Sequence, residues 1–112
     1  MSNNYSIPED VVQRIRRRDK RCVYCHKKMI YPCTGNNRSN WATIEHLDEE
    51  GPAYWDEGLK ERGLAICCGG CNSSRGTKAL REWFKSSYCI ERKITQNSVN
   101  KPVKEYLRRP VN

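Results

Sequence analysis

Two pairs of cysteines with C-x2-C spacing constrain the fold of this chain more than any other feature. Cys22 and Cys25 form the first pair, and Cys68 and Cys71 form the second. Two such half-sites supply the four tetrahedral ligands of a structural zinc site. Because a chain of 112 residues buries little apolar surface, it often depends on a metal or disulfide staple. The spacing therefore predicts one structural Zn2+ that clamps two distant segments together.

The remaining cysteines and the chain start bear on redox state and location. Seven cysteines are an odd number, so they cannot all pair as disulfides. The start Met-Ser-Asn-Asn lacks the basic and apolar regions of a signal peptide, and no stretch is apolar enough to span a membrane. We therefore expect a cytoplasmic protein, with a disulfide-stapled secreted protein as the alternative. Cys67 remains an alternative ligand to Cys68, and Cys33 and Cys89 are expected to be free thiols.

The charge balance indicates a nucleic-acid partner. The chain has 21 Lys and Arg against 13 Asp and Glu, a net charge of +8, which favours binding to phosphate. Many of these cations gather near the end of a helix expected over residues 6–21. An ordinary solvated helix face is the alternative interpretation. The residues expected to contact DNA here are Arg16, Arg17, Arg18, Lys20 and Arg21.

The hydrophobic pattern predicts a single domain of mixed α and β structure. Alternating side chains or a short apolar run indicate strands, apolar stripes at helical spacing indicate helices, and residues 47–61 form an acidic insertion. Strands are expected over 41–46 and 64–67, with helices over 72–86, 88–94 and from Asn97 or Ser98 to about Arg109. The domain spans 1–112, with a basic helix at 6–21, a zinc-stapled core at 22–86 and a C-terminal helical extension at 87–112.

The segments around the second cysteine pair resemble the HNH, or His-Me finger, endonucleases. In that family an acidic residue and a His end one strand, and the last Cys of a zinc knuckle precedes an Asn or His on a helix. The resemblance covers about Arg18 to Trp83, and its knuckle is similar to that of the endonuclease VII type. The residues that carry it are Glu45-His46, Cys71-Asn72, Arg62-Gly63-Leu64 and Gly76.

The resemblance implies a small α+β fold: a ββα-metal core stapled by the four-cysteine zinc site and flanked by N-terminal and C-terminal helices. It also implies a bacterial or phage protein that hydrolyses DNA, leaving 5′-phosphate and 3′-hydroxyl ends. Glu45 and Asn72 would hold one catalytic Mg2+ or Mn2+, for which their oxygens are suitable ligands. His46 would accept a proton from water. Arg75 and Lys78 are expected to contact a neighbouring phosphate.

Two positions depart from the family pattern. Glu45 stands where most members have Asp, and Gly63 stands where the middle Asn of the motif usually lies. Another group, such as a backbone carbonyl, must therefore orient His46. Taken singly, Glu45 and His46 also fit ordinary surface residues, and Asn72 fits a helix cap.

Three functions are weighed against one another. A metal-dependent endonuclease would nick DNA as a monomer and break both strands as a homodimer or in two encounters. The alternative is a non-catalytic, zinc-stabilised module that binds nucleic acid by charge. A zinc-stapled protein-interaction domain fits the basic helices poorly.

Overall fold

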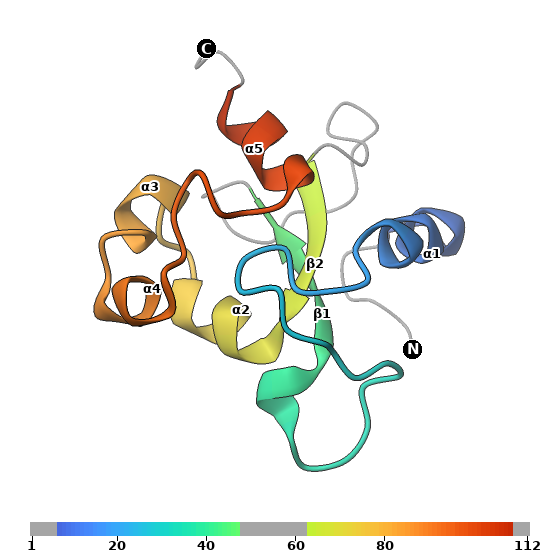
Figure 1. The fold of residues 1–112 in the computed structure, drawn as a ribbon. Helices are drawn as coiled ribbons and strands as arrows, with labels where there is room; N and C mark the ends of the chain where they lie inside the picture. The colour runs from blue at the N-terminus through green and yellow to red at the C-terminus, as the bar shows by residue number, and fades with distance from the viewer. Residues whose placement is uncertain (1–6, 48–62, 109–112) are drawn as a thin grey trace.

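The computed structural model describes residues 7–47 and 63–108 (Figure 1). Within these residues, two antiparallel strands form one sheet and short helices surround it. This agrees with the expected small α+β class. The elements are α1 (Glu9–Arg18), the 3-10 turn η1 (Arg38–Asn40), β1 (Ala42–His46), β2 (Leu64–Cys68), α2 (Gly69–Arg75), α3 (Leu80–Trp83), α4 (Ser87–Arg92) and α5 (Lys101–Leu107).

The two-stranded sheet is covered on both faces. The register sets Ile44 opposite Ile66 and Glu45 opposite Ala65, and successive side chains point to opposite faces. One face packs on α1, and the other packs on the first cysteine loop and the C-terminal helices. Figure 1 shows α1 to one side of the strands and α3 to α5 away from it. Strand β2 is therefore buried along its whole length.

Helix α1 buries Val11, Val12 and Ile15, the apolar side expected from their spacing. The helix starts at Glu9 and is preceded by Pro8, and the expected start at residue 6 lies outside the described residues. The expected continuation to residue 21 is wrong, because the chain leaves the helix at Asp19. The buried Asp19 carboxylate accepts a hydrogen bond from the Ile66 amide at 3.0 Å, which ties the helix end to β2.

The strands agree closely with the prediction, but the expected helix over 72–86 is wrong. Helix α2 begins earlier, at Gly69, because the Cys68 sulfur caps it by accepting from the Cys71 amide at 3.4 Å. The helix ends at Arg75, and Gly76 follows with a φ of +55° and a ψ of −127°, a combination that glycine adopts far more easily than residues with a side chain. The apolar stripe that suggested one long helix continues instead in the separate helix α3.

The C-terminal extension contains the two helices expected there, both shorter than predicted. Helix α5 starts after Asn100 and carries Pro102 in its first turn. Outside the two strands, Ile30 and Trp41 form an isolated bridge. The acidic insertion lies almost wholly outside the described residues. None of the helices in the described ranges is long and apolar enough to cross a membrane.

Candidate functional site

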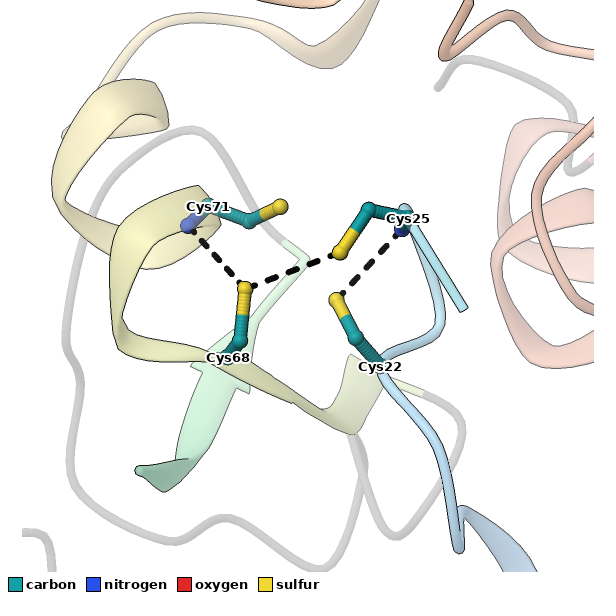
Figure 2. Close-up of side chains that lie close together, drawn as sticks. All are labelled: Cys22, Cys25, Cys68 and Cys71. Carbon is teal, nitrogen blue, oxygen red and sulfur yellow. Dashed lines mark hydrogen bonds between the residues drawn. The ribbon is translucent and has the colours of Figure 1, made fainter. Parts of the chain in front are cut away.

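The four predicted zinc ligands converge on one point (Figure 2). Cys22 and Cys25 lie in the loop after α1, while Cys68 and Cys71 lie at the end of β2 and in the first turn of α2. All four sulfur atoms lie within 4.8 Å of one another, and the Cys25 and Cys68 sulfurs are 3.8 Å apart. Zinc–sulfur bonds of about 2.3 Å in a tetrahedron place the sulfurs about 3.8 Å apart. The cluster therefore fits a single structural metal ion such as zinc.

Both halves of the cluster orient their sulfurs in the same way. The Cys25 amide donates to the Cys22 sulfur at 3.5 Å, and the Cys71 amide donates to the Cys68 sulfur at 3.4 Å. The Tyr88 hydroxyl adds a donor to the Cys71 sulfur at 3.3 Å. Donors of this kind offset thiolate charge and fix ligand direction, so they support metal binding.

The other cysteines lie outside the cluster. The Cys67 sulfur faces the Thr43 hydroxyl at 3.8 Å, and burial together with the Glu45 charge raises the pKa of Cys67 well above 9.0. Because the Cys68 sulfur belongs to the four-sulfur cluster and the Cys67 sulfur does not, Cys68 is the better ligand of the two, as its spacing predicted. Cys89 is buried, as expected for a packed thiol, and Cys33 is half-buried.

Glu45 lies inside the protein rather than on an exposed strand surface. Its residue exposure is 3%, and its Oε2 atom accepts hydrogen bonds from the Tyr24 hydroxyl at 2.7 Å and Arg75 Nη1 at 3.3 Å. Burial raises the pKa of Glu45 above 4.5, while the Arg75 charge and the Tyr24 hydroxyl oppose that change. In this structure Glu45 forms a buried ion pair.

The expectation that Arg75 contacts a DNA phosphate is wrong. Arg75 is 1% exposed, and its guanidinium is engaged inside the chain. Nη1 donates to the His46 carbonyl at 2.7 Å, Nη2 to the Leu47 carbonyl at 3.0 Å and Nε to the Lys78 carbonyl at 2.7 Å. One helical turn after Asn72, this position faces the strand, so Arg75 clamps the end of β1 to α2. Lys78 is exposed.

Asn72 faces the same strand one turn earlier. Its Nδ2 donates to the Thr43 hydroxyl at 3.0 Å and to the Ile44 carbonyl at 3.2 Å. Helix α2 thus lies along β1, with Asn72 against the middle of the strand. His46 pairs with a residue of the α1-facing core, whereas Glu45 pairs with a residue of the opposite core. Strand alternation therefore directs the Glu45 and His46 side chains to opposite faces of the sheet.

The basic run in the last turn of α1 and just after it divides into two groups. Arg16 donates to the first carbonyl of β1 at 3.0 Å, and Arg18 to the first carbonyl of β2 at 2.9 Å. Arg21 donates to a carbonyl of the cysteine loop at 3.2 Å. These three arginines help to hold the fold together, although Arg18 and Arg21 remain exposed. Arg17 and Lys20 are exposed as well and are accessible to a partner.

Sequence reasoning missed Tyr24, which links the metal cluster to the strand. Tyr24 lies between Cys22 and Cys25, its ring meets Trp83 edge-on at 4.8 Å between centroids, and its hydroxyl bonds Glu45. Burial, and then the Glu45 charge, raise the pKa of Tyr24 well above 10.0. The signal that could have identified Tyr24 is its position between the two cysteines of the first pair. A tyrosine that is buried there usually finds a hydrogen-bond partner for its hydroxyl group.

Comparisons with protein-family models, with curated proteins and with solved structures find no significant match to this chain. The arrangement of the described residues is therefore the basis for any functional conclusion. That arrangement consists of a four-cysteine cluster able to hold a structural metal ion and, beside it, a strand–strand–helix unit that carries Glu45, His46 and Asn72.

Proposed function

We propose that this protein is a metal-dependent DNA endonuclease of the HNH type, with a zinc ion as its structural staple. The observation that carries the proposal is the unit β1–β2–α2. Glu45 and His46 end β1, and Asn72 projects from α2 onto the same strand. This is the order of elements and residues that the resemblance implies. Cys68 and Cys71 fix the first turn of α2, so the metal cluster sets the position of Asn72.

The proposed chemistry assigns one task to each residue. His46 is the last residue of β1, and its ring would have to turn around the strand end toward the face of Glu45 and Asn72. There it would accept the proton of the attacking water, which requires its neutral form. Asn72 and Glu45 supply oxygen ligands for Mg2+ or Mn2+. Both hydrogen bonds to Glu45 fall on Oε2, which leaves Oε1 as the proposed ligand atom, and ligating carboxylates are commonly oriented by such outer contacts. The bound ion would stabilise charge on the phosphate and on the leaving 3′ oxygen.

A second candidate is a non-catalytic, zinc-stabilised nucleic-acid-binding module. The buried pair of Glu45 and Arg75 favours it, because this pair gives Glu45 a structural role that needs no metal. The net charge of +8 and the exposed Arg17 and Lys20 support DNA binding in both candidates. Cleavage therefore distinguishes them, whereas DNA binding alone does not.

The test is cleavage of supercoiled plasmid with EDTA, Mg2+, Mn2+ or Zn2+, with DNA binding measured in parallel. We expect nicking with Mg2+ or Mn2+ and none with EDTA. His46→Ala should bind DNA normally and cleave about 10²–10⁴-fold more slowly, because only proton removal is lost. The matched control is His26→Asn. His26 is exposed, its ring contacts the Ser98 carbonyl at 2.6 Å, and Asn tolerates its positive φ of 67°.

Three outcomes would change the assignment. Good DNA binding without cleavage under every ion would favour the binding module. Full cleavage by His46→Ala would remove His46 as the general base. Equal losses in His46→Ala and His26→Asn would indicate a general effect on folding rather than loss of proton transfer.

A further inference from the structure

An open hollow of about 440 Å3 adjoins Asn72, between η1 and the start of α2. In Figure 1 the η1 turn lies directly against the yellow helix α2. Arg38, Trp41 and Asn72 are among the residues that line this hollow. Its volume falls within the range of about 300–1,000 Å3 that is typical of small-molecule sites. It is therefore large enough for a nucleotide and lies next to a residue of the proposed catalytic group.

Trp41 is fixed in place and carries a loosely held cation. Its Nε1 donates to the Thr34 carbonyl at 3.0 Å, which sets the orientation of the half-buried ring. The Arg38 guanidinium lies 5.4 Å from the ring centroid, compared with 3.9 Å for Arg16 over Tyr31. Because Arg38 is exposed and not in close contact, a stacking ligand can displace it from the ring at little cost.

The base of the hollow is formed by closely packed backbone. The Gly69 amide donates to the Trp41 carbonyl at 2.9 Å, and a Cβ at Gly69 would overlap the Arg38 carbonyl oxygen. Any side chain at this position would push η1 away from α2. The glycine therefore allows the turn that carries Arg38 and the helix that carries Asn72 to meet, and it keeps the hollow in a defined shape.

We propose that this hollow binds one unpaired nucleotide of a DNA strand, with its base stacked on Trp41 and its phosphate contacted by Arg38. Stacking on an aromatic ring beside a cation is how proteins commonly hold single strands. A base within an intact duplex has no free face and must first leave the stack. The inference rests on the proposed function, since it takes DNA as the substrate, and it adds a preference for DNA with unpaired nucleotides near the cleavage position.

The test is binding of a fluorescently labelled 12-nucleotide single strand and of the corresponding blunt duplex, without added Mg2+ or Mn2+ so that no cleavage occurs. Trp41→Leu should weaken single-strand binding by about 10-fold, with a smaller effect on the duplex. Trp41→Phe should retain most of the affinity because it keeps an aromatic face. Arg38→Gln should weaken binding more than Arg81→Gln, which removes an equal charge from a different surface.

A second measurement uses the unaltered protein. A 2-aminopurine base placed in the single strand should change fluorescence when it stacks on Trp41, and this change should be lost in Trp41→Leu with its zinc content intact. Wild-type affinity and wild-type fluorescence in Trp41→Leu would overturn the inference. If Trp41→Leu behaves like the wild type in both measurements while the protein still nicks plasmid, the nucleotide site is contradicted and the proposed nuclease activity is retained. If the base stacks on Trp41 but no ion supports cleavage, the nucleotide site is retained as part of a non-catalytic binding module.

Discussion

The fold brings together two groups of residues from distant segments and arranges them differently. One group is the four cysteines, and the other is Glu45, His46 and Asn72. The cysteine sulfurs converge within 4.8 Å of one another. In the second group, Glu45 pairs with Arg75 in the interior, Asn72 bonds the middle of β1, and strand alternation directs His46 to the other face. The comparison teaches that a tight turn fixes side-chain direction locally, whereas residues on a strand and a helix acquire theirs from packing.

The two regions are also physically connected. The first cysteine pair brackets Tyr24, which bonds Glu45, and the second pair brackets the start of α2, which carries Asn72 and Arg75. Loss of the metal should therefore disturb the strand–helix contacts, because both cysteine segments would lose their anchor. A change at Glu45 or Arg75 should leave the metal in place if the rest of the fold survives.

The largest expected effect is loss of the metal. Cys68→Ser should abolish zinc binding and unfold the protein, because structural zinc contributes about 10–16 kcal/mol in zinc-finger peptides. A whole domain is stable by only about 5–15 kcal/mol. The neighbouring Cys67→Ala is the control and should keep its zinc. Elemental analysis measures the zinc content of each variant, and circular dichroism measures whether it is folded. Retention of zinc by Cys68→Ser and its loss by Cys67→Ala would reverse the ligand assignment.

A smaller effect is expected for the buried ion pair. Arg75→Met leaves the Glu45 carboxylate buried without its cation, and the free energy of unfolding should fall by about 3–5 kcal/mol while zinc is retained. The control is Lys85→Met in the exposed pair Lys85–Glu82, whose atoms are 3.1 Å apart. That substitution should cost about 0–1 kcal/mol. Urea denaturation of the zinc-loaded proteins checks the difference, and equal losses would show that burial adds nothing to the Glu45 pair.

The smallest effect is a pH dependence from Glu45. Because burial raises its folded-state pKa above 4.5, the folded protein holds this proton more tightly than the unfolded chain does. The stability of the wild type relative to Glu45→Gln should therefore fall as pH rises from 4.5 through the raised folded-state pKa, and then level off. A tenfold difference in proton affinity between the folded and unfolded states corresponds to about 1.4 kcal/mol. Unfolding curves of both proteins at several pH values give this difference, and a rise instead would mean that Arg75 outweighs burial.

Much of the fold followed from local patterns. The first strand was predicted from alternating side chains and the second from a short apolar run. The metal ligands were predicted because two cysteines three positions apart can share one turn. The extent of α2 could not be predicted from its apolar stripe, since a sulfur cap begins the helix and Gly76 ends it. The basic run also misled in part, because Arg16 and Arg18 bond strand carbonyls whose positions depend on the complete fold.

The four-cysteine cluster could be predicted from the spacing alone, because each C-x2-C turn restricts where its two sulfurs point. The sequence also placed Asn72 directly after the last ligand and Glu45 and His46 at a strand end. Only the tertiary structure decided that Arg75 turns inward to Glu45 instead of outward to solvent. The physical reason is that a charged side chain on a short helix can be solvated or paired. The choice depends on the buried Glu45 carboxylate and on the His46 carbonyl at the strand end, which residues about 30 positions away contribute.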